Sequence, residues 1–387
     1  MKTSSLGYNV AVVGSSSLLG KELASVLEER KFPVARLVNL DAGEEDPELP
    51  ILDLGASSAG GAGEDGDPTR TEMHVAFLAA RPKTLPAFLK PATKDSKRGE
   101  HGARRCWVID LGETLAEVPG LAVAAPALGV APPVTVAGDP LTRFIVAAHP
   151  AAIVVGRLLL SLSERFEIRA AVAEVFIPAS QWGARAIEEL QKQTVSLLSF
   201  QTIPRAVFGA QLAFNLLPRF SSAARSARRA PSGPLASRGA AGQAGLATLE
   251  GTIRDHVRQL LHDRTLLPAL RVVQAAVYHS LAVSLYVELA GAASPQEIAA
   301  ALTEGLPGGS GRIRLRRASE PAPSPVEAAG SSEILLDAIL PDAGRPGRFW
   351  LWVAVDNLRV AAENAVDIAE LLQTRVRHSG AEARTIR

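Results

Sequence analysis

The chain has 387 residues, of which 47% are hydrophobic, and its 41 basic and 40 acidic side chains leave a formal net charge of +1. This length is enough for two or three domains with cores of their own. The near-zero charge gives no reason to expect nucleic acid or an acidic membrane as a partner. The single cysteine excludes an intramolecular disulfide and a multi-cysteine metal site, so we expect no metal and a reducing, cytoplasmic location.

The first part of the chain has the pattern of a βαβ unit. Residues 9–13 form a short apolar run, which is typical of a doubly buried parallel strand, and Gly-Ser-Ser-Ser-Leu-Leu-Gly follows at residues 14–20. Residues 21–30 repeat apolar side chains at helical spacing, and residues 34–38 predict a second strand. This order is the opening of a Rossmann domain. Two further apolar runs extend the predicted sheet: residues 75–78 and 107–111.

The longest apolar run, residues 144–162, is interrupted by His149, Pro150 and Arg157. We therefore predict a buried strand followed by a helix rather than a membrane span. Residues 1–7 also have no signal-peptide core.

After about residue 147 strands alternate with helices, which favours an α+β second domain. The expected strands are residues 170–177, 270–277, 281–289 and 312–316, and the expected helices are residues 182–198 and 357–373. Low-complexity residues 221–247 predict a disordered insertion, and residues 57–71 and 93–105 predict loops.

Several stretches carry recognisable motifs. Residues 213–218 read Ala-Phe-Asn-Leu-Leu-Pro, residues 277–280 read Val-Tyr-His-Ser, and residues 352–359 contain Asp-Asn-Leu-Arg, with Ala-Glu-Asn-Ala-Val-Asp-Ile-Ala-Glu-Leu-Leu at 362–372. With residues 10–20, they resemble the aspartate-semialdehyde dehydrogenase family, including its Usg-1-like paralogues, which lack the family's catalytic cysteine.

The resemblance implies an α/β fold with two domains. Residues 1–147 would form a Rossmann-type NAD(P)-binding-like domain, and residues 148–356 a central catalytic or dimerisation domain with the insertion at 221–247. A C-terminal helix at 357–377 would pack back on the first domain. The expected partner is a second copy or another family member, as a homodimer or heterodimer, with no nucleic acid and no membrane.

The family's chemistry begins with a cysteine that attacks the aldehyde, after which hydride leaves to NADP and phosphate cleaves the thioester. The matching position here is Ala152, and a methyl group cannot act as a nucleophile. Ile177 replaces the family's pocket glutamine, and Ala116 stands where an anion-binding arginine is expected. These three substitutions indicate that catalysis has been lost.

Other candidates are weaker. His279 matches the family's general base, although a hydrogen-bonded core histidine is the alternative reading. His149 precedes the nucleophile position by three residues, Cys106 is expected to be a buried structural thiol, and Arg271 is one residue out of register with the family's substrate-binding arginine. Asp367 replaces a glutamine that contacts cofactor in the family.

The cofactor loop is incomplete. Gly14 and Gly20 match the family's G-x-x-G-x-x-G, but its middle position is Ser17. The helix N-terminus and the hydroxyls of Ser15, Ser16 and Ser17 are candidates for holding a phosphate, and a turn that only packs is the alternative. Asp41 would accept hydrogen bonds from ribose hydroxyls and repel the 2′-phosphate of NADP, so NAD is favoured if any cofactor binds, unless Asp41 is only a solvated turn residue.

Arg81 and Pro82 occupy the place of the family's "SAGGS" turn. A proline removes an N–H donor, and a long side chain narrows the approach to the backbone. This pair argues against the usual nicotinamide pose. The sequence therefore predicts a non-catalytic family paralogue that forms a dimer and responds to a nucleotide or binds a partner. The alternatives are an active NAD(P)-dependent semialdehyde dehydrogenase with an atypical site and a remnant without a selected function.

Overall fold

The structure, a computed structural model, describes residues 7–40, 73–82, 106–115, 118, 120–132, 143–220, 245–304, 306, 311–317 and 319–385, with side chains up to residue 374. The chain divides into two compact units. Unit 1 comprises Met1–Ala148 and Ala361–Arg387, and unit 2 comprises His149–Val360.

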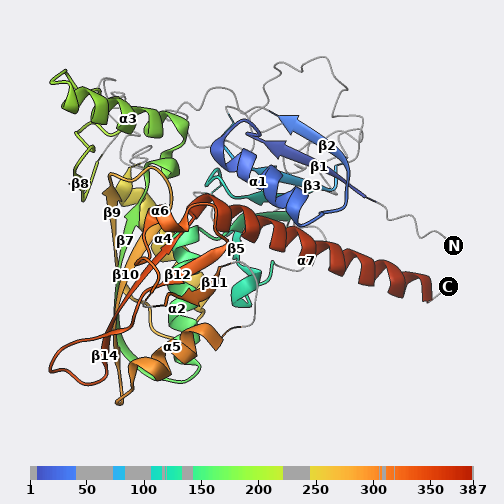
Figure 1. The fold of residues 1–387 in the computed structure, drawn as a ribbon. Coiled ribbons are helices and arrows are strands. Elements are labelled where there is room, and N and C mark those ends of the chain that lie inside the picture. Colours follow the sequence, from blue (N-terminus) through green and yellow to red (C-terminus); the bar gives the residue numbers. More distant parts are fainter. Residues whose placement is uncertain are drawn as a thin grey trace, which may run out of the picture. The chain divides into compact units, whose positions relative to one another are not determined.

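Unit 1 is built on a six-stranded parallel sheet with the order β2-β1-β3-β4-β6-β5. Its central strands are almost wholly buried, as expected for a parallel sheet whose faces are both covered. Its elements are β1 (Tyr8–Val13), α1 (Leu18–Glu29), β2 (Val34–Leu40), β3 (Val75–Leu78), β4 (Trp107–Asp110), β5 (Ala122–Ala124), η4 (Pro126–Leu128) and β6 (Phe144–Ala147) (Figure 1).

The last helix, α7 (Asn357–Thr385), contributes its residues from 361 onward to unit 1. Its small and aliphatic side chains between Ala362 and Leu372 share one core cluster with Leu23 and Val26 of α1. At the edge of this core, the Arg30 guanidinium pairs with the carboxylates of Asp367 (2.9 Å) and Glu370 (2.6 Å). Asp367 therefore ties α7 to the end of α1.

Unit 2 contains a mixed eight-stranded sheet with the order β11-β12-β14-β10-β7-β9-β8, in which β13 also pairs with β14. Helices α2, α4 and α5 pack together and against this sheet (Figure 1). Its strands are β7 (Ile168–Ile177), β8 (Leu216–Leu217), β9 (Ala269–Ala275), β10 (Leu281–Leu289), β11 (Arg312–Leu315), β12 (Glu333–Leu336), β13 (Leu340–Pro341) and β14 (Arg348–Val355). Its helices are α2 (Pro150–Ser163), η6 (Ala179–Trp182), α3 (Ala184–Leu198), α4 (Leu246–Leu261), α5 (Pro295–Glu304) and α6 (Pro325–Ala328), with α7 starting in this unit.

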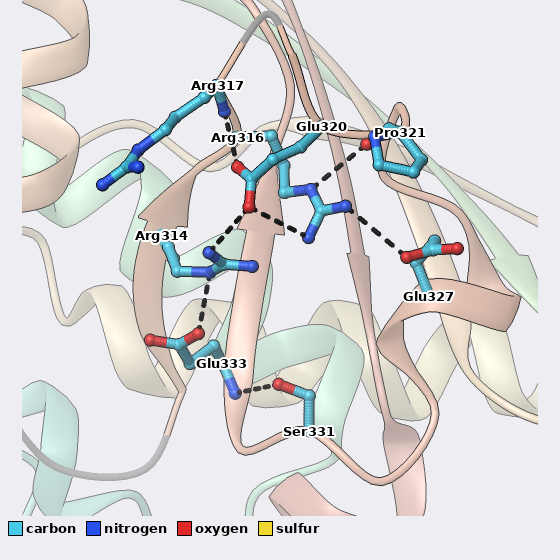
Figure 2. Close-up of polar contacts among 8 residues, drawn as sticks. All are labelled: Arg314, Arg316, Arg317, Glu320, Pro321, Glu327, Ser331 and Glu333. Carbon is cyan, nitrogen blue, oxygen red and sulfur yellow. Dashed lines mark hydrogen bonds and ion pairs between the residues drawn. The ribbon is translucent and has the colours of Figure 1, made fainter.

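A network of arginine–glutamate ion pairs links the edge strand β11 to the segments that follow it (Figure 2). Arg314 pairs with Glu320 (3.2 Å) and Glu333 (2.9 Å), while Arg316, whose side chain is only 9% exposed, reaches Glu327 at 3.5 Å. The charges largely satisfy one another, so we read the network as structural. Charged side chains on an edge strand also discourage pairing with the edge of another sheet.

On one face of this sheet a row of apolar side chains remains open. Val172, Tyr286, Trp350 and Leu340 are successive cross-strand neighbours on β7, β10, β14 and β13. Val172 is 41% exposed, Trp350 42% and Leu340 58%. We call these four residues the open face.

The α/β fold predicted from the sequence is confirmed. β3 and β10 have the predicted bounds, and the run at 144–162 is the predicted buried strand, β6, followed by helix α2. Helix α1 starts at Leu18, earlier than predicted, because the Ser17 side chain caps it. The predicted loops at 57–71 and 93–105 and residues 221–244 of the predicted insertion lie outside the described residues. The predicted disorder of residues 246–247 is wrong, because they form the start of α4, and Gly245 is its N-cap.

Candidate functional site

The glycine turn of unit 1 follows β1 directly. Gly14 has φ +82°, and its N–H donates to Leu40 O (2.7 Å). A Cβ on Gly14 would lie 2.5 Å from Ala80 Cβ, and one on Gly20 would collide with the backbone of Gly14 and Ser15. Only glycine fits at both positions, so packing alone is enough to explain them.

Ser17 stands at the middle position of the glycine pattern and is the N-cap of α1. Its hydroxyl accepts a hydrogen bond from Gly20 N (3.0 Å) and donates to Ala79 O (3.4 Å). The hydroxyl is thus already engaged by the protein. Ser16 is exposed and stays a candidate for phosphate binding, whereas Asp41 lies outside the described residues.

The loop after β4 is organised by Asp110, which is fully buried. Its carboxylate accepts hydrogen bonds from the N–H groups of Gly112 (3.2 Å), Thr114 (3.1 Å) and Leu115 (2.6 Å). Burial raises the pKa of Asp110 to about 6, although these hydrogen bonds and the charge of Arg81 oppose the shift. Ala116, the position of the expected arginine, is outside the part of the chain that the structure describes.

The nucleophile position lies in unit 2. Ala152 occupies the first turn of α2 and is 0% exposed. Cys106, by contrast, precedes β4 in unit 1 and is buried, and burial raises the pKa of its thiol to about 12. A thiol with that pKa is almost never the reactive thiolate near neutral pH.

His149 caps α2 and is paired with a second buried histidine. The Nδ1 atom of His149 accepts a hydrogen bond from Ala151 N (3.1 Å), and Nδ1 of His256 on α4 accepts one from His149 N (3.0 Å). Burial lowers the pKa of His149 to about 3, helped by nearby His256 and opposed by a hydrogen bond with Gln181. Burial likewise lowers the pKa of His256 to about 4, against the charge of Asp255. Both imidazoles are therefore neutral acceptors.

This pair predicts acid sensitivity of unit 2. The folded pKa values lie below the ordinary value of 6.5, so the stabilisation is complete above that pH and is lost as the pH falls toward 4. For His149 alone, we expect the free energy of unfolding to drop by about 2 kcal/mol between pH 7 and pH 5. In His149→Asn, which keeps a capping acceptor but does not titrate, this part of the drop should vanish in urea titrations.

Exposed His262 offers a matched control, because it lies in the left-handed region (φ 41°), which asparagine tolerates. In His262→Asn the drop in stability that His149 causes should remain. Asp110 has the opposite effect on stability. Its raised pKa stabilises the folded state as the pH falls below about 6, but this residue belongs to unit 1, whereas the histidine pair belongs to unit 2. Equal pH dependence in wild type and His149→Asn would contradict the prediction.

His279 lies in the connection between β9 and β10 and is half-buried. It makes no side-chain hydrogen bond to another described residue, and both readings of His279, a general base and a core histidine, stay predictions. The next residue, Ser280, has φ +67°, and its N–H donates to Asn357 Oδ1 (3.1 Å), which also accepts from Ser180 Oγ (3.2 Å). Hydrogen bonds of Asn357 therefore fix the backbone of the loop beside His279.

The other candidates are engaged in structural contacts. Ile177 is fully buried at the end of β7. Arg271 is exposed on β9, 3.7 Å from Glu250, with its guanidinium also 3.4 Å from Pro218 O. Asp367 pairs with Arg30 in unit 1. Each contact accounts for its side chain without a ligand.

Sequence reasoning missed His256, which the fold brings to His149 from a helix 107 residues away. No local signal marks it, because an isolated histidine on a helix looks like any polar surface residue. Among the described residues, no three His, Cys, Asp or Glu side chains gather as they would to hold a metal ion. Within the same residues, no helix is long and apolar enough to cross a membrane.

The fold and these sites define a class: a two-unit α/β protein with a Rossmann-type glycine turn in one unit and a mixed sheet with a capped helix in the other. The chain is 26% identical over 370 residues to an aspartate-semialdehyde dehydrogenase of Aquifex aeolicus, covering 95% of this chain and 98% of the relative. It is 27% identical over 373 residues to a USG-1 protein homolog of Pseudomonas aeruginosa, covering 94% and 97%. No family model matches the chain.

Solved structures share the fold. Aspartate semialdehyde dehydrogenase II of Vibrio cholerae, complexed with ASA, has a TM-score of 0.69 at 22% identity and covers 96% of this chain and 99% of its own. A probable aspartate-semialdehyde dehydrogenase of Pseudomonas aeruginosa has a TM-score of 0.67 at 24% identity, with 95% and 98% covered. The chain is thus a homologue of the aspartate-semialdehyde dehydrogenases and USG-1 proteins across most of its length.

Proposed function

We propose that this protein is a catalytically inactive homologue of aspartate-semialdehyde dehydrogenase that acts as a dimeric, nucleotide-responsive or partner-binding paralogue. The observation that carries the proposal is Ala152, a fully buried methyl group in the first turn of α2. This turn is where the family resemblance places the nucleophilic cysteine. Unit 2 contains no other thiol that could form a thioester, because the chain's single cysteine, Cys106, belongs to unit 1.

The remaining site positions support the same conclusion. The pocket position carries buried Ile177, and Arg271 is exposed beside Glu250. His279, the proposed relic of the general base, has no thiol to activate. Loss of a nucleophile alone lowers the rate of such enzymes by roughly 10⁴–10⁶. Loss of the contacts that orient the substrate would lower it further.

An active NAD(P)-dependent semialdehyde dehydrogenase with an atypical site is the second candidate. It is favoured by the relatives named aspartate-semialdehyde dehydrogenase, which extend over most of the chain. Such an enzyme would need a nucleophile other than a thiolate. The buried histidines near Ala152, His149 and His256, do not offer one, because the Nδ1 atom of each already accepts a backbone hydrogen bond. We therefore rank this candidate second.

For the nucleotide, we propose Gly14, Ser16, Ser17 and Gly20 as the turn that would receive a phosphate, with NAD preferred over NADP because of Asp41. The first helical turn after this loop contains no acidic residue, so an anion would meet no repulsion there. The engagement of the Ser17 hydroxyl in capping would leave Ser16 and the free N–H groups of α1 as the phosphate contacts.

For the partner, we propose that the open face is the dimer interface. An apolar row on a sheet, formed by Val172, Tyr286, Trp350 and Leu340, is costly to leave in water. The flanking Glu288 and Arg348 pair with each other at 2.9 Å, so a second copy would meet little net charge. A patch of this kind can serve both sides of a two-fold axis, or one side of a heterodimer with a family member.

Intact-mass measurement tests the loss of catalysis directly. After incubation with aspartate semialdehyde and either NAD or NADP in the absence of phosphate, a thioester-forming enzyme keeps an acyl adduct. We expect the mass of this protein to stay unchanged, while an active family dehydrogenase treated in parallel gains the adduct. A stoichiometric adduct on this chain would refute the proposal.

A further inference from the structure

The carboxyl edge of the unit 1 sheet contains a cationic side chain, Arg81, whose buried Nε atom makes no hydrogen bond with any residue that the structure describes. The strand order places β1, β3 and β4 side by side, and the chain moves from β1 outward to β2 before returning to β3 on the other side. This reversal is a topological switch point, outside which open α/β sheets bind their ligands. The loops after β1 and β3 flank it, and Arg81 lies in the second of these loops.

The two residues before Arg81 are in close contact with the glycine turn after β1 and with the loop after β4. Ala79 N donates to Val13 O (2.9 Å) at the end of β1. Ala80 lies so close to Gly14 that a Cβ atom on Gly14 would collide with Ala80. On the other side, a Cβ on Gly112 would lie 3.0 Å from Ala79 C. The backbone that carries Arg81 therefore has a defined place between the glycine turn and the loop after β4.

The Nε atom of Arg81 has no acceptor in the part of the chain that the structure describes. This atom is buried, and no carboxylate of the described residues forms an ion pair with it. Asp110 is close enough for its pKa to respond to the charge of Arg81. Its oxygens, however, accept three backbone N–H groups of the loop that follows it.

A second unpartnered group lies in that loop. The hydroxyl of Thr114 is buried and makes no hydrogen bond with any described residue, and Thr114 itself is 3% exposed. Its backbone N–H is bound to Asp110, the residue whose pKa Arg81 influences. Buried polar groups without partners are uncommon in native proteins and call for a missing ligand or water.

We infer that Arg81 binds the phosphate group of an anionic ligand at the carboxyl edge of unit 1. A guanidinium offers a planar fork of donors that matches phosphate oxygens, and a bound anion would supply the acceptor that the buried Nε atom lacks among the described residues. The position is one where the family resemblance predicts a glycine-containing turn, and the arginine expected after β4 is replaced by Ala116. Arg81 thus supplies the positive charge from the neighbouring strand end. The inference rests on the proposed nucleotide-binding role of unit 1.

Isothermal titration calorimetry on the full chain tests this with three probes: inorganic phosphate, ADP and NAD. The variants are Arg81→Gln, which keeps the length without the charge, and Arg81→Lys, which keeps the charge without the fork. Arg36→Ala is the control, because Arg36 is exposed on β2 beside Asn9 at the amino end of the sheet. We expect Arg81→Gln to weaken every ligand that binds by about tenfold to hundredfold, Arg81→Lys to weaken it less, and Arg36→Ala to leave it unchanged.

The outcomes separate this inference from the proposed function. If NAD binds equally well to wild type and Arg81→Gln, the inference fails while nucleotide binding stands. If phosphate or ADP binds in an Arg81-dependent way but NAD does not, the inference stands and the preference for NAD fails. If wild type binds none of the probes, both fail. Should Arg81→Gln not fold, the melting temperature of wild type in phosphate decides, because a bound anion must raise it and an unchanged value overturns the inference.

Discussion

Replacing Gln193 with alanine should lower the free energy of unfolding of unit 2 by about 3–5 kcal/mol. Gln193 is fully buried on α3 and clamps a neighbouring loop from both ends. Its Nε2 atom donates to Pro204 O (2.8 Å) and Ala210 O (3.0 Å), and its Oε1 atom accepts from Leu212 N (2.7 Å) and Ala213 N (3.1 Å). Alanine would leave these four backbone groups without their hydrogen-bond partner. The hydrophobic cluster that contains Leu212 and Ala213 is small, so little other packing holds this loop.

The matched control is Gln191→Ala on the same helix. Gln191 is exposed, so the same truncation should change the free energy of unfolding by no more than about 0.5 kcal/mol. Both values come from urea titrations followed by circular dichroism. Similar stabilities of the two variants would show that the clamp does not hold the loop.

Replacing Trp350 with glutamate should weaken self-association by at least about 100-fold. Trp350 stands in the middle of the open face, with its ring centroid 4.9 Å from that of Tyr286. Large central aromatics dominate the binding energy of interfaces, and a carboxylate in their place would be buried without a partner. Sedimentation equilibrium gives the dissociation constant for each variant.

Val326→Glu is the control for this experiment, because Val326 is 81% exposed on α6 and is not part of the open face. It should associate as wild type does. A wild-type protein that is monomeric at all concentrations, or a Trp350→Glu variant that dimerises normally, would remove the open face from the proposal. Capture of a family dehydrogenase by wild type and not by Trp350→Glu would identify the heterodimer.

Much of the fold could be predicted from the sequence because its elements carry strong local signals. The apolar runs that became β1, β3 and β10 are buried, and the spacing of Leu23 and Val26 marks the buried face of α1. Helix bounds were less accurate. The Ser17 cap starts α1 early, and α7 extends to Thr385, beyond the predicted end at residue 377.

The sites were less accessible to sequence reasoning, because they depend on contacts between distant residues. His256 meets His149 across 107 residues, and the four hydrogen bonds of Gln193 join α3 to a loop that follows it. The sequence predicted only that the long side chain of Arg81, in the place of the family's glycine turn, would obstruct the approach of the nicotinamide. That its Nε atom has no acceptor among the described residues follows only from the three-dimensional structure, in which the oxygens of Asp110 accept hydrogen bonds from the loop after β4.

The central claim is that the protein has lost the family's catalysis, and turnover tests it most directly. Phosphate-dependent reduction of NAD and of NADP would be followed with aspartate semialdehyde at high protein concentration, against a blank without protein and beside an active family dehydrogenase. We predict a rate equal to the blank with both cofactors. A phosphate-dependent rate clearly above the blank would contradict the account and establish an active enzyme, and Cys106→Ala would then show whether its mechanism needs the thiol.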